Sequence, residues 1–402
     1  MNSPTRRSFL KTSTTALVAT ISARTAFGSQ ANSRIKVGMV GCGGRGGLIA
    51  KMFVENGYFE IGGAADYFAD KAQKLGSAYQ LGADRAFSGL ECAEKMIAKG
   101  GLDAIAIISP PYFHPAQAKA AVDAGLHVYL AKPVAVDVPG IQSVRTSGEQ
   151  ARAKKRVFLI DFQSRTDSFF IEAMKRVQAG ALGDLAFGEA RYHAGRLKPK
   201  GTGTTPEDRL NNWVFDKALS GDIVVEQNIH TLDMMSWAFG NAGPLKATAT
   251  CARRVRIDVG DANDTFSGLL EYPNQVGVTF SSRQFDAQGA PEGIKFDLYG
   301  SKGALLSEYG GNVIIRGGAD TFYRGGENRE LYRTGISENM TTFHKAITEG
   351  DFTNPTLEPS LTSNLTSLLV RSAAYKGHMV TWQELLADKE VLAPDLKGLL
   401  KD

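Results

Sequence analysis

The sequence predicts two domains: an α/β domain with a parallel sheet, followed by an α+β domain built on an open, mostly antiparallel sheet. A chain of 402 residues is about twice as long as one domain of roughly 100 to 200 residues. Apolar runs of strand length alternate with helical patterns up to residue 155, which is typical of βαβ units. Beyond that point, hairpin patterns around residues 271–275 and 299–303 indicate long antiparallel strands.

The charge pattern excludes two classes of partner. The chain has 46 basic and 42 acidic residues, and four of the basic ones, Arg6, Arg7, Lys11 and Arg24, lie in an N-terminal stretch without acids. The rest of the chain is therefore neutral. A neutral body lacks the positive surplus of a protein that binds nucleic acid or an anionic membrane, so we expect neither partner.

The first residues resemble an export signal. Arg6 and Arg7 stand in the segment TRRSFLK, followed by a modestly apolar stretch and by small residues around 26–31. This pattern is similar to a twin-arginine signal with cleavage near residue 28 or 31. It predicts recognition by the twin-arginine export machinery and a periplasmic or otherwise exported protein. No segment reaches the roughly 20 apolar residues of a membrane span, so we expect none.

Cysteine usage sets a further limit. The chain has three cysteines, Cys42, Cys92 and Cys251, an odd number without paired spacing. An exported protein is free to form disulfides, but this arrangement predicts neither a structural disulfide nor a metal site built on cysteine.

A glycine-rich turn opens the folded part of the chain. A strand pattern precedes the sequence GCGGRG, and a helical pattern follows it. In this setting Gly41 allows a tight turn, Gly43 lets the backbone approach a pyrophosphate, and Gly46 lets helix and strand pack closely. Gly44 and Arg45 lie at the helix N-terminus, where phosphate is favoured. The segment predicts a dinucleotide-binding site of the Rossmann type.

Asp66 is expected to choose between the two nicotinamide cofactors. It ends the next apolar run and lies twenty residues beyond Gly46. A carboxylate at this place hydrogen-bonds the hydroxyls of the adenosine ribose and repels a 2′-phosphate. We therefore expect NAD as the cofactor, with NADP less favoured.

Two further strand ends should line the nicotinamide end of the site. A buried apolar run ends in Ser109 and Pro110, and the later strand HVYLA ends before Lys132. Folds of this kind bind ligands at the carboxyl ends of parallel strands. His114 either lines the mouth of the same site or caps the following helix, whereas His127 alternates within a strand and is expected to be structural.

Together these motifs resemble those of the Gfo/Idh/MocA oxidoreductases, the group of glucose-fructose oxidoreductase and inositol dehydrogenase. The glycine turn, the Pro/His turn, the segment AGLHV with a later Lys-Pro, and a Glu-x3-His-x2-Asp follow in order, and the resemblance covers residues 34–385. It implies a Rossmann domain and a second domain whose open sheet is often an oligomer interface. It also implies a sugar, sugar derivative or polyol as substrate and a tightly held nicotinamide cofactor.

Two motifs depart from the family pattern. The family's Glu-Lys-Pro is here Ala-Lys132-Pro, so the acid is lost. The lysine that is kept orients the substrate hydroxyl and contacts the nicotinamide in the family. The family's Asp-x-Gly-x-His-x2-Asp is here Glu226, His230 and Asp233, with asparagine in place of glycine. These changes affect the substrate end of the cleft more than the type of reaction.

His230 is the residue expected to carry the proton. Oxidising a secondary alcohol needs a group that titrates near neutrality within hydrogen-bond reach of the hydroxyl. Residues 223–239 follow a helical pattern in which Glu226 and His230 are neighbours on one face. We expect Glu226 to orient the imidazole and stabilise its protonated form, or to act as a second acid, and Lys132 to orient the reacting oxygen. A metal is not expected, because no second histidine lies nearby in the sequence.

The second domain is expected to hold the sugar. Arginine, glutamine and tryptophan side chains commonly grip sugar rings or stack on them. Several polar residues follow strand patterns in this domain or stand in the loop before the catalytic helix. The candidates are Gln163, Arg165, His193, Trp213 and Asp233.

The predicted organisation is a signal peptide at 1–31, a Rossmann domain at 32–155 and a substrate domain at 156–402. The C-terminal helices should pack back on the core, and the open sheet should form a homo-oligomer.

The predicted function is that of an exported NAD(P)-dependent oxidoreductase acting on a secondary alcohol of a carbohydrate. Because free nicotinamide is scarce outside the cytoplasm, the enzyme should retain its cofactor. The alternative is a redox-neutral NAD-dependent glycoside hydrolase or lyase working through a transient keto-sugar. A sugar-binding protein merely stabilised by the cofactor is a third hypothesis, which the presence of Lys132 and His230 disfavours.

Overall fold

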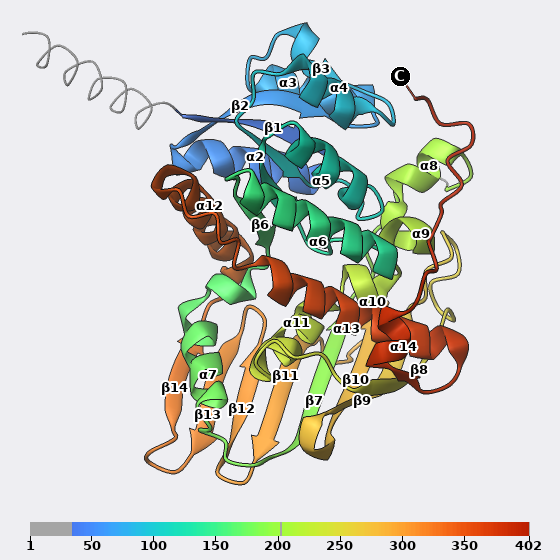
Figure 1. The fold of residues 1–402 in the computed structure, drawn as a ribbon. Helices are drawn as coiled ribbons and strands as arrows, with labels where there is room; N and C mark the ends of the chain where they lie inside the picture. The colour runs from blue at the N-terminus through green and yellow to red at the C-terminus, as the bar shows by residue number, and fades with distance from the viewer. Residues whose placement is uncertain (1–33, 202, 402) are drawn as a thin grey trace, which may run out of the picture.

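The computed structural model describes residues 34–201 and 203–401, which form two stacked domains (Figure 1). The predicted export signal lies outside the described residues. One domain is built on a six-stranded sheet and the other on a nine-stranded sheet. The predicted fold class is confirmed.

The first sheet is parallel throughout. Its strands are β1 (Ile35–Val40), β2 (Phe59–Ala65), β3 (Ala86–Phe87), β4 (Ala104–Ile107), β5 (His127–Ala131) and β6 (Phe158–Asp161). They are arranged in the order β3-β2-β1-β4-β5-β6. The order reverses between β1 and β4, and the crevice outside their carboxyl ends is where sheets of this kind bind nucleotides.

Helices cover both faces of this sheet. Those from the first domain are α2 (Gly44–Asn56), α3 (Ala69–Ala78), α4 (Cys92–Lys99), α5 (His114–Asp123) and α6 (Val138–Ala153), with a 3₁₀ turn η1 (Ala83–Arg85). Right-handed crossovers place α2 and α3 on one face and the other three on the opposite face. Part of the first face is covered by α12 (Leu331–Glu349), whose Met340 and Phe343 pack with Phe53 and Tyr129.

The parallel sheet extends beyond the boundary expected at residue 155. Strand β6 pairs in parallel with β5, and Asp161 lies opposite Ala131. This strand therefore belongs to the first domain. The prediction was wrong because an apolar run by itself does not show which sheet a strand joins.

The second sheet has nine strands. They are β7 (Leu185–Ala194), β8 (Lys246–Ala252), β9 (Thr265–Tyr272), β10 (Val276–Gln284), β11 (Gly293–Gly300), β12 (Gly303–Glu308), β13 (Asn312–Gly317), β14 (Tyr323–Glu327) and β15 (Val380–Thr381). The order is β14-β13-β12-β11-β7-β10-β9-β8-β15, and only β7 and β10 pair in parallel. Along β7, Ala190 and Tyr192 are buried while Glu189 and Arg191 are exposed, so one face is packed and the other is open.

A layer of helices separates this sheet from the first domain (Figure 1). The second domain contains α7 (Ser168–Gln178), α8 (Pro206–Asn211), α9 (Lys217–Ser220), α10 (Ile223–Glu226), α11 (Ile229–Ala238), α13 (Leu357–Lys376), α14 (Trp382–Leu386), η2 (Ser164–Thr166), η3 (Trp213–Phe215) and η4 (Pro273–Gln275). Helix α13 packs against both α6 and β8. Helix α13 therefore packs back on both domains.

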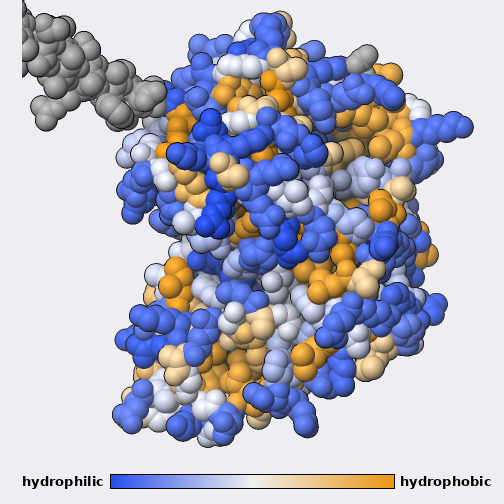
Figure 2. All heavy atoms as spheres, in the orientation of Figure 1, coloured by the Kyte–Doolittle hydropathy of each residue, from blue (hydrophilic) through white to orange (hydrophobic). Residues whose placement is uncertain are grey.

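The surface character, the possibility of a membrane span and the state of the cysteines can also be read from the structure. Hydrophilic and hydrophobic side chains are mixed over both domains on the face shown in Figure 2, and the outline narrows between the domains. No helix among the described residues combines the length and the apolar character that a membrane span requires. All three cysteines carry free thiols.

Candidate active site

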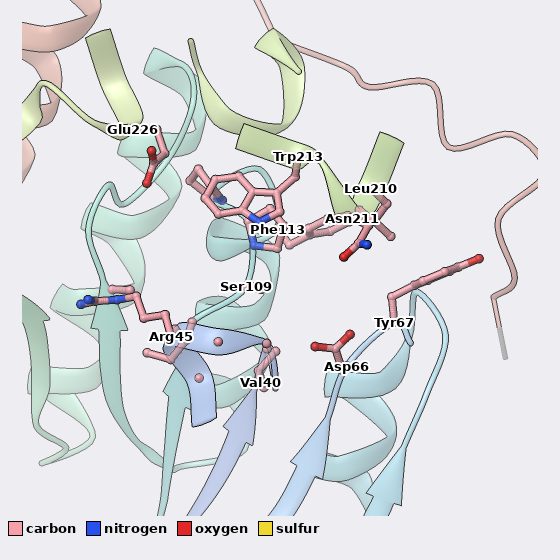
Figure 3. Close-up of a pocket in the computed structure, with 18 of the residues that line it drawn as sticks. Val40, Arg45, Asp66, Tyr67, Ser109, Phe113, Leu210, Asn211, Trp213 and Glu226 are labelled. Carbon is pink, nitrogen blue, oxygen red and sulfur yellow. The ribbon is translucent and has the colours of Figure 1, made fainter. Parts of the chain in front are cut away.

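A cavity of about 550 Å³ lies where the carboxyl ends of the parallel strands meet the second domain. One wall comes from the loops after β1, β2, β4 and β5, and the other from β7, α8, η3, α10 and α11. Figure 3 shows Asp66 and Tyr67 at one end, Arg45 and Glu226 at the other, and Trp213 between them on the opposite wall. Both the place and the volume suit a cofactor together with a small substrate.

The glycine turn has the shape that a pyrophosphate site requires. Gly41 has φ +87°, and a Cβ there would lie 2.7 Å from the backbone of Ile108. A Cβ on Gly46 would lie 1.8 Å from the carbonyl oxygen of Gly41, so only glycine lets α2 and β1 pack so closely. No described atom lies within 4 Å of a Cβ built on Gly43 or Gly44, and both line the cavity. This open backbone at the start of α2 fits the phosphates of a dinucleotide.

Asp66 stands at the end of β2 and faces the same cavity (Figure 3). Its Oδ2 accepts a hydrogen bond from Cys42 N at 2.7 Å, and its Oδ1 accepts one from Phe68 N at 2.9 Å. Burial raises the pKa of Asp66, and these two hydrogen bonds act against that rise. Each carboxylate oxygen keeps acceptor capacity for a ribose hydroxyl.

Helix α8 of the second domain bridges the Asp66 end of the cavity. Lys71 Nζ donates to Asn211 Oδ1 at 2.8 Å, and the Tyr67 hydroxyl donates to Glu207 Oε1 at 3.4 Å. Tyr67, Lys71 and Asn211 all line the cavity. The Asp66 end of the cavity, where the adenosine of a bound NAD would lie, is thus enclosed by both domains.

The C-terminal segment 387–401 supports the same end from behind. It runs from the second domain back to the first (Figure 1). Leu400 N donates to the Tyr67 hydroxyl at 3.2 Å, and Leu400 O accepts from Leu90 N at 3.0 Å. Because Tyr67 and Leu90 line the cavity, the segment holds two parts of its wall together.

The loop after β4 contributes to the cavity wall, but His114 does not. Ser109 and Pro110 line the cavity. His114 is fully buried and is not part of the wall; its Nδ1 lies 2.8 Å from Pro133 O and its Nε2 lies 2.8 Å from Ser109 O. Burial lowers the pKa of His114 to about 4. The expectation that it binds the cofactor was wrong, because its ring ties two loops together instead.

Lys132 and Glu226 meet at the other end of the cavity. Lys132 Nζ donates to the backbone oxygen of Glu226 at 2.8 Å and lies 3.5 Å from its Oε1. Burial lowers the pKa of Lys132, and the charge of Glu226 opposes this shift. Gln227 donates to Glu226 Oε2 and accepts from the Tyr192 hydroxyl at 2.9 Å. All four side chains line the cavity.

His230 lines the cavity but does not pair with Glu226. The predicted helix is interrupted at Gln227 and Asn228, so the two side chains do not share one continuous helical face. His230 Nδ1 is buried and has no hydrogen-bond partner among the described residues. Burial and the charges of Lys132 and Arg45 lower the pKa of His230 well below its usual value. The expectation that Glu226 stabilises a protonated imidazole was therefore wrong.

Arg165 and Asp233 form a buried ion pair and do not reach the cavity. Arg165 Nε donates to Asp233 Oδ1 at 2.8 Å, and the Ser363 hydroxyl donates to the same oxygen at 2.7 Å. Arg165 Nη1 also donates to Asn241 Oδ1 at 2.8 Å. Their predicted role in substrate binding was wrong, because the pair links η2 to α11 and α13.

Gln163 and His193 also lie outside the cavity wall. Gln163 is fully buried; it donates to Asp161 Oδ1 at 2.8 Å and accepts from the Tyr309 hydroxyl at 3.1 Å. His193 Nε2 lies 3.0 Å from Ser281 Oγ on the neighbouring strand, and burial lowers the pKa of His193. Of the five predicted substrate residues, Trp213 alone lines the cavity (Figure 3).

Arg45 has a double role at the turn. It lines the cavity, its Nη2 lies 2.6 Å from Asp161 Oδ2, and its Nη1 donates to the Tyr332 hydroxyl at 2.5 Å. Its Nε is buried without a partner among the residues described. Arg45 therefore joins the phosphate turn to the wall of the substrate end.

Several wall residues are not among those predicted from the sequence. Gln227 stands inside a recognised motif, so its position offered a signal. The others come from β7, α8, the end of β12 and α12, where no motif marks them. These residues are Tyr192, Asn211, Gln227, Tyr309 and Tyr332. In the described part of the chain, no three His, Cys, Asp or Glu side chains are grouped so that they could hold a metal ion.

A Rossmann domain with an open phosphate cradle and a second domain closing the nicotinamide end define an NAD-dependent oxidoreductase. Residues 35–162 match the oxidoreductase family with an NAD-binding Rossmann fold, and residues 170–306 match the GFO/IDH/MocA C-terminal domain. The chain belongs to the Gfo/Idh/MocA family.

Known relatives are similar along most of the chain. Inositol 2-dehydrogenase of Rhizobium meliloti (strain 1021) is 23% identical over 349 residues, which are 85% of this chain and 96% of that protein. Aldose-aldose oxidoreductase from Caulobacter crescentus superposes with a TM-score of 0.68 at 19% identity, over 87% of this chain and 99% of that one. The WlbA dehydrogenase from Bordetella pertussis, solved with NADH and UDP-GlcNAcA, gives a TM-score of 0.72 at 18% identity, over 87% of this chain and 98% of that one. The two solved structures share the fold of this chain.

Proposed function

We propose that the protein oxidises or reduces a secondary alcohol of a sugar, a sugar derivative or a polyol with NAD. One observation carries this proposal: Lys132, Glu226 and His230 line one end of a cavity whose wall also contains the glycine turn and, at the far end, Asp66. Bound along the glycine turn, NAD would supply the hydride acceptor or donor at that end.

The chain's own residues supply the acid–base chemistry. A neutral imidazole is the form that accepts a hydroxyl proton, and the lowered pKa of His230 keeps the ring in that form. The Lys132 ammonium is positioned to donate to the reacting oxygen and to favour negative charge on it. Glu226 keeps the ammonium in place through its backbone oxygen and its carboxylate.

The walls around this end suit a hydroxylated ring. Trp213, Tyr192 and Tyr309 contribute aromatic rings to the wall, and Gln227 contributes an amide. Aromatic rings stack on the apolar faces of sugars, and amides pair with their hydroxyls. The names of the relatives, an inositol dehydrogenase and an aldose oxidoreductase, agree with such a substrate.

Export and retention of the cofactor are part of the proposal. The Arg6-Arg7 segment supports export, and the enclosure of the adenosine end by α8 and the C-terminal segment supports slow release of NAD. In a bacterial host, replacing Arg6 and Arg7 by lysine should leave the protein in the cytoplasm. Periplasmic accumulation of that variant would count against the export route.

A homo-oligomer through the open face of the nine-stranded sheet is also proposed. That face exposes Phe187 (39%) and Leu269 (52%), and packing against a second copy would remove their apolar surface from water. Sedimentation analysis should show an assembly that Leu269→Glu dissociates. A monomer at micromolar concentration would rule the interface out.

The second candidate function is cleavage of a glycoside without net oxidation. It is favoured by the separation of Glu226 from His230, which leaves two independent groups for proton transfer. One group would take the hydroxyl proton while bound NAD accepts the hydride, and the other would remove the acidified proton beside the new carbonyl and pass it to the leaving aglycone. Water would then add at the carbon that the aglycone left, and the hydride would return from the cofactor to the carbonyl carbon.

The experiment that separates the two functions begins with protein purified without added nucleotide. Its absorbance near 340 nm is recorded before and after adding a panel of sugars and aryl glycosides. A lasting rise in absorbance, which shows that a sugar has reduced the bound NAD, supports the oxidoreductase if a second sugar reverses it. Release of the aglycone without a lasting change in absorbance supports the glycosidase. Loss of the absorbance change and of aglycone release in Lys132→Met and His230→Gln would tie both signals to this site. Absence of bound nucleotide would contradict retention.

A further inference from the structure

His230 lacks the partner that usually orients a catalytic imidazole. In most acid–base sites a carboxylate or a carbonyl accepts from the second ring nitrogen and fixes the ring. Here Nδ1 has no such partner among the residues described, and Glu226 bonds Lys132 instead. Something other than a hydrogen bond must therefore fix the ring.

Aromatic packing takes that place. The Tyr309 ring centroid lies 4.9 Å from the centroid of the His230 ring, tilted by 50°, and Phe162 lies edge-on at 6.5 Å. Tyr309 follows β12, and its own backbone N–H donates to Ile294 O at 2.8 Å. Tyr309 is thus a fixed surface beside the imidazole.

The hydroxyl of Tyr309 is held by a chain of buried groups. Asp161 is fully buried and accepts from Arg45 at 2.6 Å and from Asn339 Nδ2 at 2.8 Å. A carboxylate only accepts, so Gln163 must turn its NH₂ group toward Asp161 and its oxygen toward Tyr309. The Tyr309 hydroxyl is therefore the donor, and this hydrogen bond fixes the orientation of the Tyr309 ring.

We propose that Tyr309, held by Gln163, is a positioning residue that fixes the His230 ring in place of a hydrogen-bonding partner. This inference rests on the proposed role of His230 as the proton carrier. The charged groups acting on His230 are Lys132 from the end of β5 and Arg45 from α2, and Asp161 lies behind Tyr309. Gln163, which was expected to bind the substrate, acts through Tyr309 instead.

Kinetics of Tyr309→Phe give the first test. The substitution keeps the ring and removes only the hydroxyl, so the protein should fold. We expect kcat to fall by about tenfold, less than the roughly 10²- to 10⁴-fold lost with the base itself, while KM changes little. Gln163→Leu should lower kcat similarly, and the double variant should be no worse than either single one, because both break the same chain. Tyr299→Phe, whose hydroxyl pairs with Glu189 on the open face of the sheet, is the matched control.

A second readout does not depend on activity. In protein labelled with ¹⁵N-histidine, the His230 signals are assigned by their loss in His230→Gln and then titrated in both variants. We expect the imidazole of Tyr309→Phe to titrate at a different pH and to broaden, whereas Tyr299→Phe matches the native protein. Unchanged His230 signals, or a rise in KM at constant kcat, would overturn the proposal. If no substrate is turned over by the native protein, the proposed function fails while the titration still decides the positioning role.

Discussion

At the scale of the residue, the neutrality of His230 is the main electrostatic feature of the site. Burial of the His230 imidazole lowers its pKa, and the charges of Lys132 and Arg45 lower it further. Glu226, which would raise that pKa if it paired with the ring, is engaged by Lys132. In the proposed reaction, the site therefore combines a cation for the oxygen with a neutral base for the proton.

The pH dependence of alcohol oxidation follows from this arrangement. A base with a lowered pKa stays neutral as the pH falls through 6.5, the usual histidine value, and is protonated only at more acidic pH. We expect kcat/KM at saturating NAD to stay level through that point and to decline below it, measured from about pH 4.5 to 9. A midpoint at the ordinary histidine value would show that the ring is solvated and would contradict the burial argument.

The residues that could be predicted from the sequence are those carried by local motifs. Gly41, Asp66, Lys132 and His230 each stand at a fixed distance from a strand or a turn, and all line the cavity. Tyr309 could not be predicted in this way, because the fold brings it to the site from a strand end without a motif.

The wrong assignments have a physical reason as well. Arg165, Asp233 and Gln163 are polar residues next to predicted site elements. The sequence alone does not separate a side chain facing a cleft from one satisfied inside the core. Buried polar groups require partners. Arg165 and Asp233 pair with each other, and Ser363 donates to Asp233. Gln163 donates to Asp161.

At the scale of the element, the break between α10 and α11 shapes the site. In an uninterrupted helix the carbonyl of Glu226 would accept from the N–H of His230. Here that carbonyl accepts from Lys132 Nζ, a contact that helical periodicity could not reveal. The break separates Glu226 from His230 and gives the lysine a fixed backbone acceptor.

The contact between α2 and β1 yields a prediction. In Gly46→Ala the new methyl group would overlap the carbonyl oxygen of Gly41, so the helix must move away from the strand and distort the phosphate cradle. We expect a lower melting temperature and the loss of most NAD binding, measured by thermal unfolding and calorimetric titration.

Gly47→Ala is the matched control for that prediction. No described atom lies within 4 Å of a Cβ at Gly47, and alanine is favoured over glycine in a helix by up to about 1 kcal/mol. This variant should bind NAD normally and be slightly more stable. If Gly46→Ala bound NAD as well as this control does, the close packing would not be needed for the cradle.

The buried pair of Arg165 and Asp233 is predicted to stabilise the fold without contacting substrate. Arg165→Met leaves a buried carboxylate without its cation, which costs about 3–5 kcal/mol. Urea unfolding should report that loss, while the KM of folded protein stays near the native value. Arg176→Met, which breaks the half-exposed pair with Glu172, should cost at most about 1 kcal/mol. A large rise in KM for Arg165→Met with little loss of stability would restore the arginine to the substrate site.

At the scale of the whole molecule, the site exists only where the two domains meet. The half proposed to hold the cofactor comes from the parallel sheet, and the half proposed for acid–base chemistry combines Lys132 from that domain with Glu226 and His230 from the other. The order and class of the domains could be predicted, since they depend on periodicity and turn chemistry. The cover that α12 gives to the parallel sheet and the path of the C-terminal segment could not, because long-range contacts leave no local pattern.

The C-terminal segment leads to a prediction about cofactor exchange. A chain shortened to end at Asp388 loses the hydrogen bonds that join Leu400 to Tyr67 and Leu90, so the wall at the adenosine end can open. We expect NAD to dissociate roughly tenfold faster, the equivalent of one or two hydrogen bonds, and less nucleotide to copurify. Stopped-flow displacement of bound NADH measures the rate, and kcat at saturating NAD should stay unchanged because the segment does not reach the reacting end.

Tyr67→Phe, which removes the hydroxyl shared by Glu207 and Leu400, should give part of the same effect in the full-length chain. Equal release rates in all three proteins would mean that the segment does not hold the cofactor and that retention must arise at the nicotinamide end.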